Sequence, residues 1–318
     1  MMMLSQTRIV LNKSLAKLVW VGVVLMAGCA SAPPKPSDVP VVVLSQPIPE
    51  VPTRAPRLGL ALGGGAARGF AHVGVIQVLE QNGIRPDLLV GTSAGSMVAA
   101  MYASGKSASE LEAAALTMEE ATLTDWSLPI LGRGMLRGEA LTRYVRQAVG
   151  GKLLENMQMP LGVLATDLAS GQGVLFRRGD AAQAVRASSA VPGVFAPVHI
   201  AGRDYVDGGL VAPVPVRYAR DMGAEVVLAV DISSAPEGNS AVGSVQVLLQ
   251  TFAIMGQSIN RHELAGADVV LRPALAGVGS ADFTARQRAI EAGRAAMQAA
   301  LPQLRTQLAR RLPVVGRP

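Results

Sequence analysis

One serine lies in a setting typical of a nucleophile. Gly91-Thr92-Ser93-Ala94-Gly95 follows the apolar run Leu88-Leu89-Val90 and precedes a small-residue helix predicted over 94–104. A strand that turns sharply into a helix leaves room only for small residues beside the serine. The turn raises the hydroxyl above the sheet, at the positive end of the helix. Ser93 in another setting would be a helix N-cap, but the strand–turn–helix order favours a nucleophile.

A glycine-rich loop follows the first apolar run, 58–62. Its sequence is Gly63-Gly64-Gly65-Ala66-Ala67-Arg68-Gly69. Backbone amides of such a loop converge on a small anion, either a phosphate or the oxyanion of an acyl-transfer intermediate. A dinucleotide fingerprint also follows a strand, but Asp87 precedes the second strand instead of ending it. A P-loop is excluded because no Gly-Lys-Ser/Thr follows the glycines.

An aspartate with two glycines, Asp207-Gly208-Gly209, is the third motif. Taken alone it indicates a turn. A hydrolase triad on an α/β fold would need a histidine late in the chain. His72 lies in a predicted helix, His199 ends an apolar strand, and His262 sits in a helical stretch without a loop signal. The residues therefore give a Ser–His–Asp triad little support.

These three motifs, in this order, resemble the patatin-like phospholipase family. Three further stretches are similar to bacterial members: Ala165-Thr166-Asp167-Leu168, Ala187-Ser188-Ser189-Ala190-Val191-Pro192-Gly193 and Gly279-Ser280-Ala281-Asp282-Phe283. The resemblance covers residues 57–300. It implies an α/β protein with a three-layer α/β/α fold, a mainly parallel central sheet and a Ser–Asp dyad. The sequence shows no evident metal site and no dense carboxylate loop for calcium, and we expect no cofactor.

The resemblance also implies a role for each residue. Ser93 would attack an ester carbonyl, and Asp207 would take its proton and then activate water. The implied oxyanion hole consists of Gly64, Gly65, Ala66 and Arg68, with Arg68 holding the loop. The remaining motif positions are Gly63, Gly69, Gly91, Gly95, Gly208 and Gly209.

Two physical requirements follow from this dyad. A free aspartate has a pKa of about 3.9, too low for an efficient base at neutral pH. Burial must therefore raise the pKa of Asp207, or the oxyanion hole must supply the driving force. We therefore expect Asp207 to be poorly solvated and hydrogen-bonded to Ser93. Ala66 replaces the third glycine of the common loop pattern, and its Cβ is tolerated only if φ stays negative.

Alternating strands and helices predict a mainly parallel sheet covered on both faces. The predicted strands are 58–62, 88–90, 160–166, 225–232 and 269–271. The predicted helices are 69–82, 94–104, 107–118, 138–148, 243–261 and 284–310. The segment 119–137 is open to two interpretations, a lid or a connector.

The N-terminus has the organisation of a bacterial lipoprotein signal. Residues 1–28 combine three basic residues, a nine-residue apolar run and small residues before Cys29, the only cysteine. Met26-Ala27-Gly28-Cys29 resembles a lipobox, which implies cleavage before Cys29 and its acylation. Ala30 favours the outer membrane, facing the periplasm. The alternative is an uncleaved apolar anchor. Residues 29–56 read as a proline-rich tether, 57–310 as the hydrolase domain and 311–318 as a tail.

The amino-acid composition limits the classes of molecule that the protein is expected to bind. Aromatic residues make up only 3% of the chain, which argues against a nucleic-acid binder built on stacking. The net charge of +6 falls to +3 without residues 1–28, and the remaining charges are mixed. The expected substrate is a phospholipid or lysophospholipid, met at a membrane through the lipid anchor. A general carboxylesterase or acyltransferase, and a catalytically silent lipid-binding lipoprotein, are the alternatives.

Overall fold

The computed structural model describes residues 54–119, 125, 133–234, 243–279 and 281–310. The predicted signal peptide, Cys29, most of the tether and the tail 311–318 lie outside these residues. Most of the segment 119–137 also lies outside them, so its interpretation as lid or connector stays open.

An eight-stranded sheet forms the centre of the molecule, in the order β10-β9-β1-β2-β4-β8-β7, with β5 also paired to β4. The first five strands of this order are parallel to one another. The pairs β4–β5, β4–β8 and β7–β8 are antiparallel. The parallel strands are β1 (Leu58–Leu62), β2 (Leu88–Thr92), β4 (Leu161–Asp167), β9 (Val226–Val230) and β10 (Val269–Leu271). The others are β5 (Gly173–Phe176), β7 (Val198–Ile200) and β8 (Arg203–Asp207), with β3 (Gly134–Leu136) and β6 (Gly193–Phe195) forming a separate pair.

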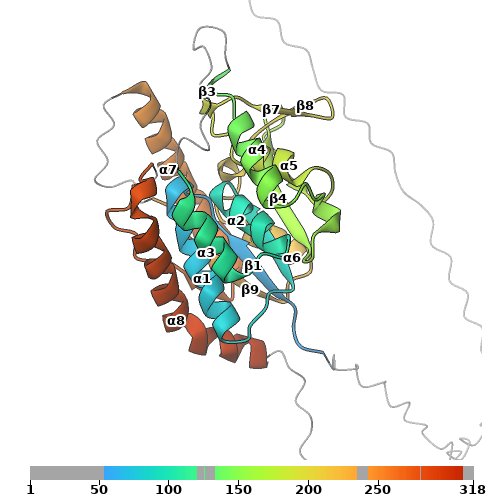
Figure 1. Ribbon diagram of the computed structural model, residues 1–318, viewed down its shortest axis with the longest axis vertical. Helices are drawn as coiled ribbons and strands as arrows, with labels where there is room; N and C mark the ends of the chain where they lie inside the picture. The colour runs from blue at the N-terminus through green and yellow to red at the C-terminus, as the bar shows by residue number, and fades with distance from the viewer. Residues whose placement is uncertain (1–53, 120–124, 126–132, 235–242, 280, 311–318) are drawn as a thin grey trace, which may run out of the picture. The chain divides into compact units, whose positions relative to one another are not determined.

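The central strands are buried on both faces. Every residue of β1, β2, β4 and β9 is buried, which explains their continuous apolar sequences. Helices supply the two covering layers (Figure 1). They are α1 (Phe70–Gln81), α2 (Ala94–Ala103), α3 (Ala108–Thr117), α4 (Glu139–Ala148), α5 (Ala181–Ser188), α6 (Val216–Asp221), α7 (Ser244–Glu263) and α8 (Arg286–Arg310).

The two layers bury separate hydrophobic cores. The larger core joins β1 residues such as Leu60 to α1, α2, α3 and α8. The smaller joins the opposite face, including Ala61, to α6. In Figure 1, α1, α3 and α8 lie side by side. Helices α1 and α8 approach so closely that a Cβ on Gly74 would lie 1.9 Å from the carbonyl oxygen of Ile290. The three-layer α/β/α prediction is confirmed.

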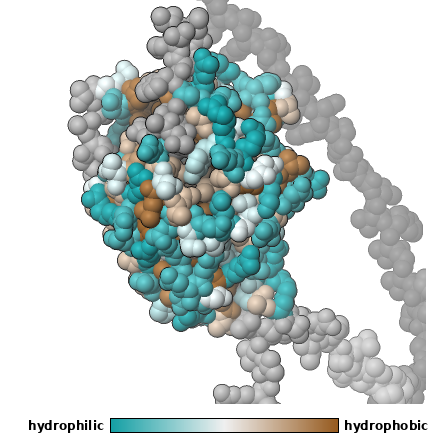
Figure 2. Space-filling view, in the orientation of Figure 1, coloured by the Kyte–Doolittle hydropathy of each residue, from teal (hydrophilic) through white to brown (hydrophobic). Residues whose placement is uncertain are grey.

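All five predicted strands and all six predicted helices are present within a few residues of their expected ends. The sequence did not indicate α5, α6 or the short strands β3, β5, β6 and β8, and it indicated β7 only as an apolar strand that ends at His199. These strands have three to five residues each, too few for a clear apolar period. Among the described residues, no helix combines the length and apolar character needed to cross a bilayer. Figure 2 shows hydrophilic and hydrophobic residues interspersed over the visible face.

Candidate active site

Ser93 occupies a strained turn between β2 and α2. Its φ is +52° and its ψ is −124°, a conformation that costs a non-glycine residue about 1–3 kcal/mol. The flanking glycines permit this turn because the backbone packs tightly around it. A Cβ on Gly91 would lie 2.5 Å from the Cα of Ser96, and one on Gly95 would lie 2.2 Å from the carbonyl oxygen of Leu62. The expected strand–turn–helix setting of Ser93 is therefore confirmed.

A second serine fixes the backbone of this turn. The N–H of Ser93 donates to the Oγ of Ser188, 2.9 Å away, at the end of α5. The Ser188 hydroxyl donates in turn to the carbonyl oxygen of Leu164 in β4. Ser188 is fully buried. The Ser93 amide is thereby tied to the sheet and is not available to a substrate.

Asp207 is held at the end of β8 by its own backbone. Its N–H donates to the carbonyl oxygen of Ala190 at 3.0 Å, and its carbonyl oxygen accepts from the hydroxyl of Thr166 at 2.8 Å. The following glycine permits a close approach of the chain to β4, since a Cβ on Gly208 would lie 2.3 Å from the carbonyl oxygen of Leu164. The motif is a turn, as its residue types indicate, and the turn places the carboxylate beside Ser93.

The Asp207 carboxylate has little contact with water. The residue is only 6% exposed, and this burial raises the pKa of Asp207 to about 6. Two hydrogen bonds oppose the effect of burial, one from the N–H of Gly209 at 2.7 Å and one from the Ser93 hydroxyl. Asp207 is thus buried and hydrogen-bonded to Ser93. Its pKa lies where a carboxylate both ionises at neutral pH and accepts a proton readily.

The glycine-rich loop is anchored at its start. The N–H of Gly63 donates to Val230 in β9 at 3.0 Å, and the carbonyl oxygen of Gly63 lies 2.8 Å from Nε2 of His72. Burial lowers the pKa of His72 to about 4, so the ring is neutral and its Nε2–H donates to Gly63. Residue 72 therefore holds the loop and takes no part in proton transfer to Ser93.

The expected oxyanion hole needs one correction. The N–H of Gly64 donates to the carbonyl oxygen of Pro213 at 2.9 Å, so it is not free to bind an oxyanion. Gly64 instead packs on the nucleophile, since an added Cβ would lie 3.1 Å from the Cβ of Ser93. The N–H groups of Gly65 and Ala66 have no hydrogen-bond partner among the described residues, and both residues line a cavity with Ser93.

Two further expectations about the loop are altered by the geometry. The φ of Ala66 is +50°, so the expectation of a negative φ is wrong. This left-handed conformation is accessible to alanine at a cost, and it turns the chain into the short helix Ala66–Gly69. Arg68 lines neither cavity at Ser93. Its buried Nε has no hydrogen-bond partner among the described residues, and its charge faces Asp231 beyond β9.

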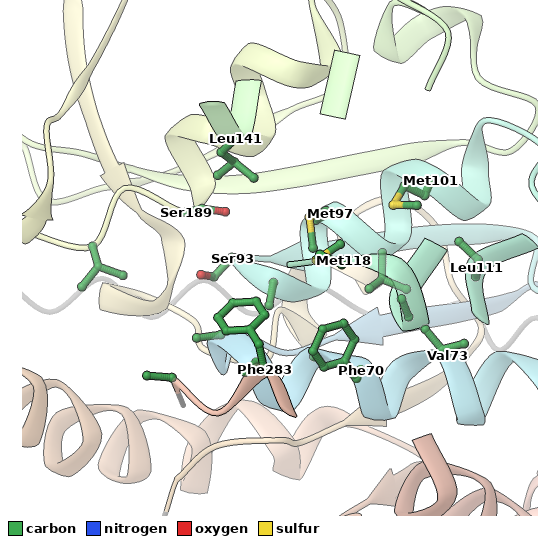
Figure 3. Close-up of a pocket in the computed structure, with 18 of the residues that line it drawn as sticks. Phe70, Val73, Ser93, Met97, Met101, Leu111, Met118, Leu141, Ser189 and Phe283 are labelled. Atoms are coloured by element: carbon green, nitrogen blue, oxygen red, sulfur yellow. The ribbon is translucent and has the colours of Figure 1, made fainter. Parts of the chain in front are cut away.

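An apolar cavity of about 240 Å³ opens at Ser93. In Figure 3, Ser93 and Ser189 lie at one end of the labelled residues, whereas Met101, Leu111 and Val73 lie at the other. Among the described residues that line the cavity, the two serines are the only ones with a hydroxyl, and none is ionisable. The remainder of the wall is largely methionine, phenylalanine and branched aliphatic side chains, namely Phe70, Met97, Val98, Met118, Leu136, Leu141, Val191, Phe195 and Phe283. Such a cavity suits a hydrocarbon chain.

A second, wider chamber of about 680 Å³ meets the first at Ser93. Asp207, Gly64, Gly65 and Ala66 lie along one side, and α7 forms another. Because Ser93 and Ala66 line both spaces, an ester placed on Ser93 can extend one substituent into each.

The two remaining histidines lie away from Ser93. His199, in the middle of β7 and not at its end, shares a hydrogen bond with Asp204 at 2.9 Å, and His262 is exposed on α7. Neither lines a cavity with Ser93. Within the described ranges, no three His, Cys, Asp or Glu side chains gather as a metal site.

Sequence reasoning did not identify Ser188 or Thr166 as parts of the site. Both residues lie in stretches, 165–168 and 187–193, that are similar to bacterial patatin-like proteins. The similarity did not indicate what these residues do. Their hydrogen bonds to the backbones of Ser93 and Asp207 give that role. Sequence spacing could not reveal these contacts, because Ser188 lies 95 positions from Ser93 and Thr166 lies 41 positions from Asp207.

Ser188→Ala is expected to lower kcat about tenfold. The variant leaves the Ser93 N–H and the Leu164 carbonyl oxygen buried without their partner, at a cost of about 1–3 kcal/mol. Because the displaced group is the nucleophile, kcat should fall more than KM rises. Steady-state ester hydrolysis and thermal melting measure both effects. The exposed Ser258→Ala is the matched control, and an unchanged kcat in folded Ser188→Ala would show that this contact does not position Ser93.

Comparisons with known proteins show which family the chain resembles. The family model described as "Patatin-like phospholipase" matches residues 60–220, just over half of the chain. An uncharacterized NTE family protein of Mycobacterium tuberculosis is 37% identical over 185 residues, which cover 58% of this chain and 51% of the relative. Patatin-like phospholipase domain-containing protein 6 of Mus musculus is 33% identical over 188 residues, covering 57% of this chain and 14% of the relative.

The fold has a counterpart among solved structures. The crystal structure of VipD from Legionella pneumophila aligns with a TM-score of 0.54 at 14% sequence identity, covering 80% of this chain and 67% of that one. The chain spans about half the length of the mycobacterial relatives that it matches. From the family match over residues 60–220 and the shared fold, this chain belongs to the patatin-like phospholipase family.

Proposed function

We propose that this protein is a serine carboxylester hydrolase that releases fatty acids from acyl esters of glycerolipids, including (lyso)phospholipids, through a Ser93–Asp207 dyad. One observation carries the proposal. The Ser93 hydroxyl donates to a buried carboxylate of raised pKa at the point where an apolar cavity meets an open chamber. The family supports lipid hydrolysis in general, and the dyad and the substrate are the parts proposed here.

The reaction runs in two stages. Asp207 accepts the Ser93 proton as Oγ bonds to the ester carbonyl carbon, and the N–H groups of Gly65 and Ala66 stabilise the oxyanion. The intermediate collapses, the ester C–O bond breaks, and the departing alkoxide takes the proton from Asp207. An acyl-Ser93 ester remains. Water then loses a proton to Asp207 and attacks this ester, and the return of that proton to Ser93 releases the fatty acid.

A place in the cell envelope is a further proposal. The basic segment, apolar run and small residues before Cys29 support export and acylation at that cysteine. Ala30 supports an outer-membrane position facing the periplasm. Two or more acyl chains hold a protein on a bilayer stably, whereas one chain binds only marginally.

The function is tested by fatty-acid release from a graded set of substrates. Purified protein is assayed with p-nitrophenyl esters and monoacyl glycerolipids of increasing chain length. We expect hydrolysis to rise with chain length until the apolar cavity is filled. Complete inactivity on every acyl ester, with the protein folded, would exclude a hydrolase and favour a silent lipid-binding lipoprotein.

Met101→Ala is expected to shift the preferred acyl chain to a longer one. Met101 lines the end of the cavity opposite Ser93 and is only 3% exposed, so its truncation lengthens the space for the chain (Figure 3). The ratio of kcat/KM for long over medium p-nitrophenyl esters measures the shift. The change itself should cost about 2–5 kcal/mol of stability, so the assay is run well below the melting temperature.

The control for this variant is Met297→Ala. Met297 is fully buried in α8 but does not line the cavity, so its truncation costs similar stability without altering the chain-length ratio. Equal ratios in wild type, Met101→Ala and Met297→Ala would show that the chain does not occupy this cavity.

A further inference from the structure

Among the described residues that line it, the open chamber beside Ser93 offers hydrogen-bonding groups and no positive charge. Its polar side chains other than Ser93 and Asp207 are Ser233, Ser234, Gln246 and Gln250. Apolar residues and glycines complete the wall. Among the described residues that line this chamber, Asp207 is the one ionisable group, and at neutral pH its charge is negative.

The neighbouring segments add no cation. Helix α7, which forms one wall, carries no charged residue from Ser244 to Asn260. In sequence, the stretch 235–242, which links Ser234 to α7, contains no lysine, arginine or histidine. Arg133 is paired with Asp204 at 2.5 Å and is 62% exposed. It does not line the chamber.

The chamber receives the alcohol part of the ester. The acyl chain fits the narrow apolar cavity, so the departing alcohol extends on the other side of Ser93, where Asp207 must reach its oxygen. In a lysophospholipid the phosphate follows the glycerol carbons and would lie within this chamber. Proteins that bind phosphate do so with arginine, lysine or converging amides. Here the free N–H groups of Gly65 and Ala66 bind the oxyanion at Ser93, so the phosphate would meet the like charge of the Asp207 carboxylate.

We propose that the chamber selects an uncharged, hydroxyl-bearing alcohol, so that a monoacylglycerol is hydrolysed faster than a lysophospholipid with the same acyl chain. The hydroxyls and amides of the chamber suit the free hydroxyls of glycerol, which need partners but no counter-charge. This inference rests on the proposed ester hydrolysis at Ser93 and names the substrate class within it.

The first test compares three substrates with one acyl chain, all in the same non-ionic micelles. These are a monoacylglycerol, lysophosphatidylcholine and lysophosphatidylglycerol. We expect kcat/KM for the monoacylglycerol to exceed that for the anionic lysophosphatidylglycerol about tenfold, a difference typical of one unfavourable charge contact. A rate on lysophosphatidylglycerol equal to or above that on the monoacylglycerol would overturn the proposal.

The second test places a cation in the chamber. Gln246→Lys is expected to raise the lysophosphatidylglycerol-to-monoacylglycerol ratio of kcat/KM several-fold, and added salt should reverse the gain. Gln257→Lys adds the same charge to an exposed position of α7 outside the chamber and should leave the ratio near that of the wild type. An unchanged ratio in Gln246→Lys, or an equal rise in Gln257→Lys, would show that the head group does not enter the chamber.

The outcomes also separate this inference from the proposed function. If no acyl ester is cleaved, both are wrong. If esters are cleaved with a preference for the anionic lysophospholipid, the hydrolase stands and the neutral chamber alone is rejected.

Discussion

Ser93→Ala should lower kcat/KM for acyl esters by at least about 10³-fold, the effect expected when an activated nucleophile is removed. Alanine retains a Cβ, so the φ of +52° remains equally strained, and the bond from the residue 93 N–H to Ser188 is kept. The elbow should therefore fold as before. Fatty-acid release and thermal melting measure the two properties together.

Ser258→Ala provides the control, because Ser258 is exposed on α7 and lines neither cavity. It should keep the wild-type rate. A folded Ser93→Ala protein that retained more than about a tenth of the wild-type rate would be incompatible with covalent catalysis at this serine.

Asp207→Asn should lower kcat about 10²–10⁴-fold, the range expected when a positioned general base is lost. The amide oxygen of asparagine still accepts from the N–H of Gly209, so the turn is preserved, but an amide does not take up the Ser93 proton. The binding of the acyl chain is untouched, and KM should change much less than kcat. Steady-state kinetics on a chromogenic ester separate the two parameters.

The wild-type pH profile follows from the same carboxylate. Burial raises the pKa of Asp207 to about 6, and the base must be ionised to act. We therefore expect kcat/KM to be low at pH 5, to rise through pH 6 and to level above pH 7. Asp207→Asn should lack this rise, and a flat wild-type profile across pH 6 would exclude Asp207 as the base.

Stability should change in the opposite direction to activity. In the unfolded chain the pKa of aspartate is about 3.9, below the folded value of Asp207, so the folded state holds its proton more tightly. The folded protein loses stability as pH rises from about 4 to about 6, by roughly 3 kcal/mol, and the loss persists above pH 6. The amide of an asparagine at this position does not ionise. Asp207→Asn should therefore melt at a higher temperature than wild type at pH 8, with the difference vanishing near pH 4.

Much of the scaffold was predictable because its elements carry regular patterns. The strands β1, β2, β4 and β9 are buried on both faces and read as continuous apolar runs. The nucleophile elbow is similarly local, since Gly91, Ser93 and Gly95 lie within one turn. Short-range sequence constraints of this kind determine the position of Ser93 without knowledge of the rest of the fold.

The partners of Ser93 could not be read in the same way. Asp207 lies 114 positions later in the chain, and its residue type with two glycines indicates only a turn. The pairing of β8 with β4, which brings Asp207 opposite Ala165, depends on tertiary contacts. Packing around the loop likewise determines two further features. The Gly64 N–H donates to the carbonyl oxygen of Pro213, and the φ of Ala66 is positive. Family likeness pointed to the loop, and the hydrogen bonds decided which amides are free.

The most direct test of the dyad is the site of covalent modification by a long-chain alkyl fluorophosphonate. The reagent is incubated with the protein, and the adduct is located by peptide mass spectrometry. We predict one adduct, on Ser93, absent in Ser93→Ala and formed far more slowly in Asp207→Asn. An adduct on another residue, or undiminished labelling in Asp207→Asn, would contradict the assignment of Ser93 and Asp207 as nucleophile and base.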